Sequence, residues 1–275
     1  MNSDLEGKVI LVTGASGGIG SAIARRFAEE GARVVLHYHK NRAGAEELRR
    51  ELGPAQMLVV RADLTKEPDV FKLFAHAVKK FGRVDTLIAN AGAWEPREVP
   101  LQEMSLRQWN ATQLGVLTST FLCLREFFRL VKKQKSGNAV LISSTAGVFG
   151  EAGHADYAAA KSAMAFGLTR SLKNEIARLA PHTAKYCGGR VNCVCPGWTV
   201  VPRTAGKLRD QKSVKRVVAT MALPQIARPD DMAHAVVFLS SDTLARHLTG
   251  QTLVIAGGME GRLLWKPSEV DAAIA

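Results

Sequence analysis

The 275-residue sequence has no apolar run that approaches the roughly 18–20 residues needed by a membrane-spanning helix. Its first residues, MNSDLEGK, contain no apolar signal segment. We therefore expect a cytoplasmic protein that neither crosses a membrane nor is exported. Hydrophobic residues still make up 47% of the chain, which is enough apolar surface to offset the entropy of ordering and to exclude a disordered protein.

Aromatic residues are scarce, at 6%, and no nucleic-acid-binding motif accompanies the formal net charge of +12. The basic residues are mostly interleaved with acidic ones, and their densest cluster is Arg125, Arg129, Lys132, Lys133 and Lys135. This distribution is typical of a solvated surface, so we expect no nucleic-acid partner. The positive charge favours anionic small molecules such as phosphorylated cofactors or carrier-bound thioesters.

The sequence is also poor in cysteine, with four residues: Cys123, Cys187, Cys193 and Cys195. Without an export signal, free thiols are expected rather than disulfides. No Cys/His pair has the spacing of a zinc site, so we predict no metal. Cys193 and Cys195 are two residues apart, and on a strand they would face the same side.

What the sequence does contain is a regular alternation of apolar strands and helices. Helical patterns cover about 19–30, 43–52, 70–81, 103–111, 113–133 and 156–179, and apolar strands are predicted at 8–13, 33–38, 57–63, 85–90, 138–144, 190–195 and 251–256. The strands lack polar alternation, which indicates a parallel sheet covered on both faces. The prediction is one doubly wound α/β domain of the Rossmann type with a seven-stranded parallel sheet, spanning residues 1–258, and a C-terminal extension at 259–275.

A glycine-rich turn follows the first strand, running from Gly14 to Gly20 in the sequence GASGGIG. Glycines let the backbone approach a pyrophosphate, while free N–H groups at the start of the next helix face its charge. The same residues also fit G-x-S-x-G, which would make Ser16 the nucleophile of an α/β-hydrolase. The phosphate-binding interpretation is favoured, because a nucleophile elbow normally follows several strands and has no use for Gly20.

The spacing T-G-x-x-x-G-x-G resembles the short-chain dehydrogenase/reductase family, and the resemblance extends over about residues 7–258. Within that family, the sequence is similar to 3-oxoacyl-[acyl-carrier-protein] reductase-like and glucose-dehydrogenase-like members. The matching motifs are Thr13–Gly20, Asp63-Leu64, Asn90-Ala91-Gly92, Ser144, Tyr157 with Lys161, Pro196-Gly197 and Leu248–Gln251. The resemblance implies an oxidoreductase that transfers a hydride between a nicotinamide and a carbonyl or secondary alcohol.

Ser144, Tyr157 and Lys161 are the expected catalytic residues. Tyr157 and Lys161 are four apart and so lie on one helix face, where an ammonium beside the phenol lowers a pKa that is normally about 10. Tyr157 would then act as general acid and base. Ser144 ends a strand at the edge where doubly wound sheets bind ligands, and its hydroxyl would donate to the substrate oxygen. By resemblance, Lys161 would also hold the nicotinamide ribose.

Val116 departs from the family pattern. It stands where the family usually has an asparagine that helps water connect the lysine to solvent, and a valine side chain can neither donate nor accept a hydrogen bond. The proton path would be rebuilt from Gln113 or Thr112, run through water alone, or be impaired. The last case opens a second functional class, a nicotinamide-binding protein with weak or no catalysis.

The end of the second strand determines which nicotinamide is bound. An acidic residue there would repel a 2′-phosphate, but this chain has Tyr38, His39, Lys40 and Arg42, which favours NADP(H). Gly17 weakens the preference, since NADP enzymes of the family often carry arginine there, so NAD(H) stays open. The expected cofactor-binding residues are Gly14, Ser16, Gly17, Gly18, Ile19, Gly20, Tyr38, His39, Lys40, Arg42, Asp63, Leu64, Asn90, Ala91, Gly92, Tyr157, Lys161, Pro196, Gly197 and Thr199.

The substrate and the assembly are less constrained. Trp94 and Glu95 are candidate pocket walls, and Trp198–Leu223 would cover a small carbonyl or alcohol substrate or a carrier-bound acyl group. The helices at about 103–133 and 156–180 carry surplus apolar residues, as does the segment 263–266 with Trp265. By resemblance we expect a homotetramer, with a homodimer as the alternative.

Overall fold

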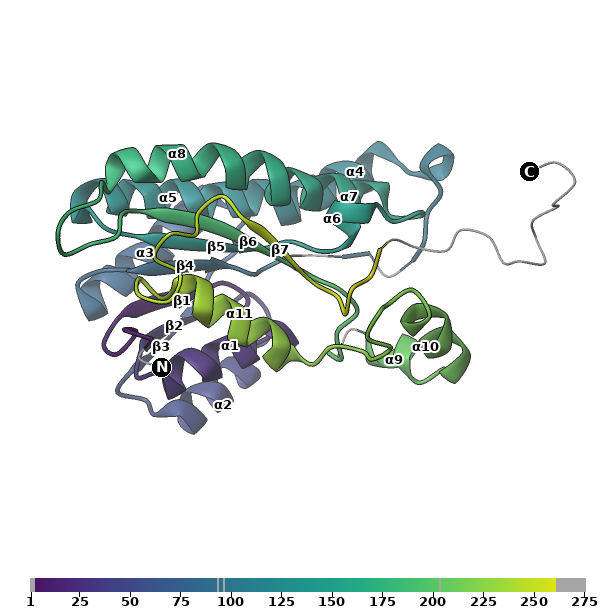
Figure 1. The fold of residues 1–275 in the computed structure, drawn as a ribbon, viewed down its shortest axis with the longest axis horizontal. Coiled ribbons are helices and arrows are strands. Elements are labelled where there is room, and N and C mark those ends of the chain that lie inside the picture. Colours follow the sequence, from purple (N-terminus) through teal and green to yellow (C-terminus); the bar gives the residue numbers. More distant parts are fainter. Residues whose placement is uncertain (1–2, 93, 96, 203, 261–275) are drawn as a thin grey trace, which may run out of the picture.

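The seven strands form one parallel sheet in the order β3-β2-β1-β4-β5-β6-β7 (Figure 1). A computed structural model describes residues 3–92, 94–95, 97–202 and 204–260. The strands are β1 (Val9–Val12), β2 (Arg33–Tyr38), β3 (Met57–Arg61), β4 (Thr86–Ala89), β5 (Asn138–Ile142), β6 (Arg190–Pro196) and β7 (Thr252–Ile255). The strand order reverses between β1 and β4, and ligands of doubly wound sheets bind at such a switch point. The predicted fold class is confirmed.

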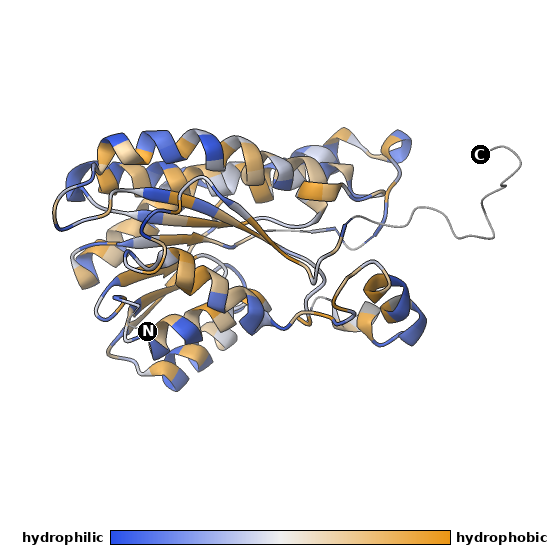
Figure 2. Cartoon of the chain, viewed as in Figure 1, coloured by the Kyte–Doolittle hydropathy of each residue, from blue (hydrophilic) through white to orange (hydrophobic). Residues whose placement is uncertain are grey.

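The strands form where the sequence is continuously apolar. Every residue of β1, β4, β5 and β6 is buried, because helices cover both faces of the sheet. Figure 2 shows the same pattern, with apolar strands inside and polar residues on the outer helix faces. The strands stand in regular parallel register, for example Leu11 opposite Val35 and Leu87. The carboxyl ends of the strands therefore meet at one edge, where the site lies.

Helices cover both faces of the sheet (Figure 1). On one face lie α1 (Gly18–Glu29), α2 (Arg42–Leu52) and α11 (Pro229–Ser240), with α1 packed against α11. On the other lie α3 (Glu67–Phe81), α5 (Ser119–Gln134) and α8 (Thr169–Leu179). Shorter elements near the site are η1 (Leu101–Glu103), α4 (Leu106–Thr112), α6 (Ala146–Phe149) and α7 (Ala155–Ser162).

Both long helical stretches contain a π-helical turn, which the sequence did not indicate. The turn η2 (Gln113–Thr118) joins α4 to α5, and η3 (Ala163–Leu168) joins α7 to α8. The stretches predicted at 103–111 and 113–133 are therefore one continuous helix from α4 onward. A π turn accommodates an extra residue within a helix, and such turns are frequent at functional sites. Here α7 packs against η2.

Helix α11 was not predicted from the sequence. Pro229 occupies its first turn, and the backbone N–H of Arg228 donates to the Asp231 carboxylate at 2.7 Å. Its buried residues, among them Met232, Val236 and Leu239, share one face, but apolar residues run without a break from Ala235 to Leu239 and include Phe238, which is 39% exposed on the other face. Such a helix lacks the one-sided pattern that identifies a surface helix.

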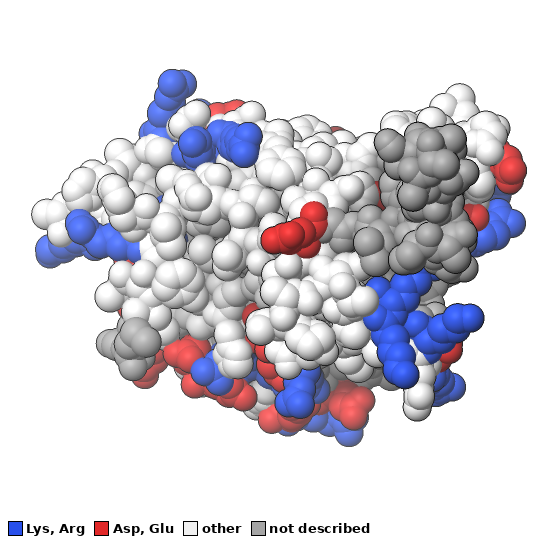
Figure 3. Space-filling model, turned by 45° about the vertical axis from the view of Figure 1, so that its right-hand side comes forward, with Lys and Arg blue, Asp and Glu red and all other residues white. Residues whose placement is uncertain are grey.

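The segment after β6 forms two short helices beyond the carboxyl edge of the sheet, α9 (Ala205–Leu208) and α10 (Gln211–Val218). Basic side chains gather over this part of the surface (Figure 3), and they include Arg209, Lys212, Lys215 and Arg216. Of the predicted extension at 259–275, only Met259 and Glu260 belong to the described residues, so the segment 263–266 lies outside them. No helix in the described part of the chain is long and apolar enough to cross a membrane.

Candidate active site

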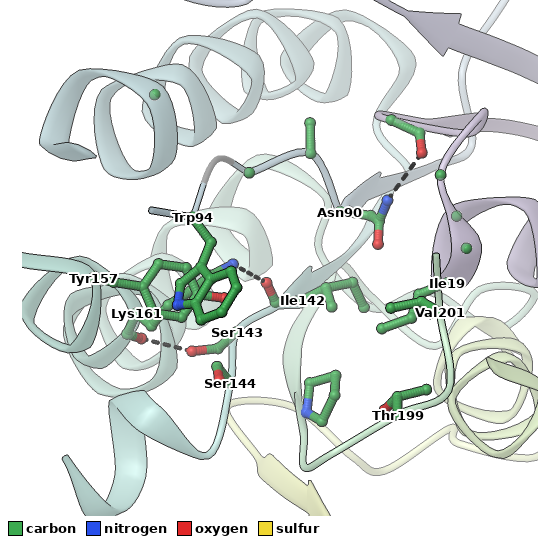
Figure 4. Close-up of a pocket in the computed structure, with 18 of the residues that line it drawn as sticks. Ile19, Asn90, Trp94, Ile142, Ser143, Ser144, Tyr157, Lys161, Thr199 and Val201 are labelled. Carbon is green, nitrogen blue, oxygen red and sulfur yellow. Dashed lines mark hydrogen bonds between the residues drawn. The ribbon is translucent and has the colours of Figure 1, made fainter. Parts of the chain in front are cut away.

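A cavity of about 820 Å³ follows the carboxyl ends of β1 to β6. One end lies over the glycine turn and the ends of β2 and β3, and the other is lined by Ser144, Tyr157 and Lys161. Figure 4 shows Ser144, Tyr157, Lys161 and Trp94 toward one side of this pocket, with Asn90, Ile19 and Val201 toward the other. The structure thus brings the expected catalytic residues and the glycine turn into one elongated site.

The glycine turn depends on the absence of side chains at two positions. Gly14 has φ +66°, a left-handed conformation that glycine adopts without strain. A Cβ atom on Gly20 would lie 2.2 Å from the Gly14 carbonyl oxygen and 2.7 Å from the Asn90 side-chain nitrogen. The first turn of α1 therefore packs directly on the backbone of Gly14.

The start of α1 fits a phosphate group. The helix begins at Gly18 after an extended Gly17, and no side chain caps its N-terminus. The first N–H groups of an α-helix have no partner within the helix, and here they line the cavity. With the helix dipole they favour an anion, so the residues present fit the pyrophosphate of a dinucleotide.

Asn90 holds the glycine turn in place from the neighbouring strand. Its amide nitrogen donates to the carbonyl oxygens of Thr13 at 2.9 Å and of Gly14 at 3.3 Å. The Thr13 hydroxyl in turn accepts from the backbone N–H groups of Asn90 at 2.9 Å and Ala91 at 3.0 Å, and donates to the Ile88 carbonyl at 3.1 Å. Asn90, which was expected to bind the cofactor, lines the cavity and also locks the end of β4 to the turn.

His37 supports the same turn from β2, a role that could not be anticipated from the sequence. The backbone N–H of Gly14 donates to His37 Nδ1 at 3.0 Å, and His37 Nε2 lies 3.1 Å from the Ala62 carbonyl oxygen. This pairing requires the neutral ring with its proton on Nε2. Burial lowers the pKa of His37 to about 4, with a smaller contribution from nearby His39, although the bond to Ala62 opposes the shift.

At the end of β2 the cavity is lined by His37, His39, Lys40 and Asn41. Of the residues expected to contact the cofactor here, Tyr38 is buried away from the cavity wall, and Arg42 is exposed near Glu46. Asn41 was not anticipated. Its Nδ2 donates to the Ser16 carbonyl at 3.3 Å and its Oδ1 accepts from the Gly44 N–H at 3.0 Å, so it joins the glycine turn to the start of α2.

Asp63 and Leu64 line the cavity after β3. The Asp63 carboxylate accepts from the hydroxyl of Thr65 at 2.7 Å and from its backbone N–H at 3.1 Å. The pKa of Asp63 is lowered chiefly by the Thr65 hydroxyl, with smaller contributions from His39 and Lys66. The group is a charged acceptor at neutral pH, suited to an amino donor such as that of adenine.

Tyr157 and Lys161 lie on one face of α7, as predicted. Lys161 Nζ is 5.6 Å from the centroid of the Tyr157 ring and donates to the Ile142 carbonyl at 2.7 Å. The Lys161 side chain is only 3% exposed, whereas Tyr157 and Ser144 are half-buried on the cavity wall. Ser144 Oγ accepts from the Ala146 N–H at 3.1 Å, which leaves its proton free to be donated into the cavity.

Two side chains that sequence reasoning missed anchor α7. Ser143 Oγ donates to the Lys161 carbonyl at 2.7 Å, where the helix passes into η3 (Figure 4). Asp156 is 1% exposed and accepts from Thr112 Oγ1 at 2.6 Å, from Gln108 Nε2 at 3.3 Å and from the N–H of Tyr157 at 2.8 Å. The helix that carries Tyr157 is therefore tied to both β5 and α4.

Val116 is fully buried in η2, and its carbonyl accepts from Thr120 Oγ1 at 2.7 Å and Ser119 Oγ at 3.2 Å. Thr112 and Gln113, which were candidates to replace the missing asparagine, bond to Asp156 instead; Gln113 Nε2 donates to its backbone carbonyl at 2.9 Å. Gly115 and Ser119 line the cavity. The residues of this helical run that line the cavity, Gly115 in η2 and Ser119 at the start of α5, are thus ones that the sequence did not single out.

Further cavity walls come from segments that follow β4, β5 and β6. They include Trp94, Glu151, Thr145, Trp198, Val201 and Thr204, together with the expected Pro196, Gly197 and Thr199. The Trp94 ring stacks against His154 with centroids 5.2 Å apart and planes inclined by 39°. Glu95 lies in a neighbouring cavity that shares Trp94. Spacing could not identify these residues, because irregular segments place them.

The four cysteines, the absence of a metal motif and the alternative role of Ser16 were also noted in the sequence. The thiols are free, burial raises the pKa of Cys123 to about 12, and the sulfurs of Cys193 and Cys195 lie 3.9 Å apart on one side of β6. Among the described residues, no group of three or more His, Cys, Asp or Glu could hold a metal. His37 cannot act as a general base for Ser16, because both ring nitrogens of His37 are engaged in hydrogen bonds.

A doubly wound sheet with an uncapped glycine turn, a buried lysine and an accessible tyrosine and serine defines a dinucleotide-dependent oxidoreductase. The chain belongs to the short-chain dehydrogenase/reductase family, and a family model described as enoyl-(acyl carrier protein) reductase matches residues 14–260. This membership supports an NAD(P)-dependent enzyme and gives no support to a hydrolase.

Two curated relatives cover nearly the whole chain. A 3-oxoacyl-[acyl-carrier-protein] reductase of Synechocystis sp. is 33% identical over 257 residues, 93% of this chain and 98% of the relative. A cis-4-hydroxycyclohexanecarboxylate dehydrogenase of Sinomonas cyclohexanicum is 38% identical over 253 residues, 91% of this chain and 96% of the relative. One is named a reductase and the other a dehydrogenase.

Proposed function

We propose that the protein is an NADP(H)-dependent oxidoreductase that transfers a hydride between the nicotinamide and a carbonyl or secondary alcohol. The observation that carries the proposal is the shared cavity: Tyr157, Lys161 and Ser144 line the same 820 Å³ space as the glycine turn. A dinucleotide with its pyrophosphate at the start of α1 would extend from there toward Tyr157.

Ser144 and Tyr157 act on the substrate oxygen, and Lys161 acts on the nicotinamide ribose. Ser144 donates its hydroxyl hydrogen to the substrate oxygen and so stabilises charge that develops there. In the reductive direction Tyr157 gives its proton to that oxygen, and in the oxidative direction the phenolate accepts the proton from the alcohol. Bound nicotinamide supplies or receives the hydride at the carbon. Lys161, anchored by the Ile142 carbonyl, lies near the Tyr157 ring and holds the nicotinamide ribose.

The preference for NADP(H) rests on charge at the end of β2. His39 and Lys40 line the cavity, and no acidic residue stands on β2 or in the first positions after it. A 2′-phosphate would accept charge-assisted hydrogen bonds there, whereas a carboxylate would oppose it. Arg42, which follows at the start of α2, adds positive charge further away. NADPH should bind more tightly than NADH, and this difference in affinity should shrink as the salt concentration rises.

Proton exchange with solvent is proposed to pass beside Gly115 and Ser119, in place of the asparagine absent at Val116. Gly115 and Ser119 line the cavity, and the Ser119 hydroxyl, which donates to the Gly115 carbonyl at 2.9 Å, can still accept a hydrogen bond, while Thr112 and Gln113 are engaged by Asp156. The alternative, a nicotinamide-binding protein with weak or no catalysis, rests on the buried Val116 side chain, which offers no hydrogen bond. Measured turnover of a ketone distinguishes the active enzyme from the non-catalytic nicotinamide-binding protein.

The substrate is proposed to be a small carbonyl or alcohol, with carrier-bound acyl groups as the alternative. The two relatives support one class each by name, a hydroxycyclohexanecarboxylate and a 3-oxoacyl carrier. A homotetramer is also proposed. Exposed apolar side chains on α4, η2, α5 and β7 support pairing of subunits there, namely Leu106, Leu114, Phe121, Leu253 and Val254. Light scattering at micromolar concentration should give a mass above that of one chain.

The test is to follow reduced-nicotinamide absorbance with a panel of small ketones, cyclic ketones and acyl thioesters. The protein should oxidise NADPH with at least one of them, more efficiently than NADH. A protein that binds NADPH but turns over no member would support the non-catalytic alternative. A protein that binds neither nucleotide would contradict the proposal.

A further inference from the structure

A second cavity, of about 460 Å³, lies beside the first, and the two share Trp94 as a wall. Its other walls include Glu95 and Arg97 from the segment after β4, and Arg107, Gln108 and Thr112 from α4. None of the sequence motifs points to this space. It adjoins the part of the site that holds Tyr157, because Thr112 bonds to Asp156, the residue before Tyr157.

The second cavity is positively charged. Arg97 and Arg107 contribute two exposed guanidinium groups, and within the described ranges neither forms an ion pair or a side-chain hydrogen bond. Glu95 contributes one carboxylate, which accepts from the backbone N–H of Arg97 at 3.1 Å. Two planar cations without partners at the wall of one cavity are suited to an anion, which each can bind through two parallel N–H groups.

A buried histidine packs behind the Trp94 ring of the shared wall. His154 is 1% exposed and stacks against Trp94, and neither of its ring nitrogens has a hydrogen-bond partner. A buried polar group without a partner costs free energy in the protein without substrate. His154 lines neither cavity; its ring supports Trp94, which forms the wall between them.

We propose that this second cavity is a subsite for an anionic group on the substrate, held by Arg97 and Arg107. The substrate class is then a ketone or secondary alcohol that carries a carboxylate or phosphate several bonds from the reacting carbon. The reacting carbon lies at Ser144 and Tyr157, and the anion lies beyond Trp94. This inference rests on the proposed function for the reacting end, but the anion site itself requires no turnover.

Equilibrium binding to the full-length protein, measured by calorimetry, tests the site without catalysis. Cyclohexanecarboxylate is compared with its neutral amide, and pantetheine 4′-phosphate with pantetheine, which separates a carboxylate source from a phosphate source. At least one anion should bind about tenfold more tightly than its neutral partner, because hydrogen bonds between an arginine and an anion are stronger than those to a neutral group. Equal affinity within both pairs, or no binding, would overturn the proposal.

Variants assign the effect to the two arginines. Arg97→Gln and Arg107→Gln should each remove most of the preference for the anion, and Arg107→Lys should keep part of it. Arg178→Gln, an exposed arginine of α8, is the matched control and should change nothing. An unchanged preference in both glutamine variants would overturn the site. If the anion binds in an arginine-dependent manner while no ketone is reduced, the proposed function fails and the anion site stands.

Discussion

Thr112 donates its hydroxyl to the buried carboxylate of Asp156 at 2.6 Å, which joins α4 to the helix that carries Tyr157. Gln108 and the N–H of Tyr157 complete the hydrogen bonds of this carboxylate. Asp156 is 1% exposed, and its hydrogen-bond donors in the described structure are all uncharged groups. The position of the Tyr157 backbone is thus fixed by residues more than forty positions earlier in the chain.

Loss of that hydroxyl should destabilise the fold. Thr112→Val keeps the side-chain shape but removes a donor from a buried carboxylate, so the free energy of unfolding should fall by about 1–3 kcal/mol. Urea unfolding measures the change. Thr118→Val, in the same helical run but without a side-chain hydrogen bond in the described structure, is the control. Equal losses in the free energy of unfolding for the two substitutions would show that the Thr112–Asp156 hydrogen bond does not stabilise the fold.

Acid should destabilise the protein through His37. Burial lowers its pKa to about 4, below the ordinary 6.5 of an unfolded chain, so the unfolded state binds a proton first as the pH falls. The contribution of neutral His37 to the free energy of unfolding is complete above about pH 6.5. It is lost progressively as the pH falls toward 4, and the total loss is about 3 kcal/mol at most.

Urea unfolding of the wild type and of His37→Asn at several pH values between 7 and 4 checks this effect. Asparagine can still accept from the Gly14 N–H but does not titrate, so the variant should lose stability less steeply on acidification. Identical pH slopes for the two proteins would mean that His37 is not the titrating group.

A side chain at Gly20 should disrupt the nucleotide site. The Cβ of Gly20→Ala would lie 2.2 Å from the Gly14 carbonyl oxygen, so the turn or the start of α1 must move. NADPH affinity, measured by fluorescence titration, should fall at least tenfold. Gly167→Ala, where the added carbon would meet no described atom within 4 Å apart from its chain neighbours and the backbone of its own helix, should bind NADPH like the wild type. Normal binding by Gly20→Ala would argue against a phosphate at this turn.

Charge at the end of β2 should select the nucleotide. Lys40→Ala removes a cation from the cavity wall and should weaken NADPH by about tenfold, with little change for NADH. Arg42→Ala should have a smaller effect in the same direction. Arg33→Ala, at the opposite end of β2, is the control. If NADPH and NADH affinities respond alike to Lys40→Ala, the preference does not arise at Lys40.

The strands could be predicted almost to their ends, because buried parallel strands are continuous apolar runs such as Val9–Val12. The glycine turn and the pair Tyr157 and Lys161 could be predicted for a related reason. Their geometry depends on neighbours within a few residues. Helix α11 could not be predicted, since its apolar residues continue from the buried face onto exposed Phe238 and so do not form one stripe in the sequence.

The supports of the site could not be found in the sequence, because each joins residues that are distant along the chain. Ser143 bonds to Lys161, and His37 bonds to the glycine turn, only once the strands are assembled. The strand end illustrates the same limit. His37 and His39 line the cavity while Tyr38 between them is buried, because side chains alternate along a strand.

The most direct test of the account is Tyr157→Phe. The substitution removes only the hydroxyl, and the ring can keep its place above Lys161. NADPH binding should stay within about twofold of the wild type, whereas kcat/KM for the best ketone of the panel should fall by about 100-fold or more, because general acid catalysis typically contributes at least that factor. Turnover retained at the wild-type rate, with NADPH bound, would show that Tyr157 is not the proton donor and would contradict the proposed mechanism.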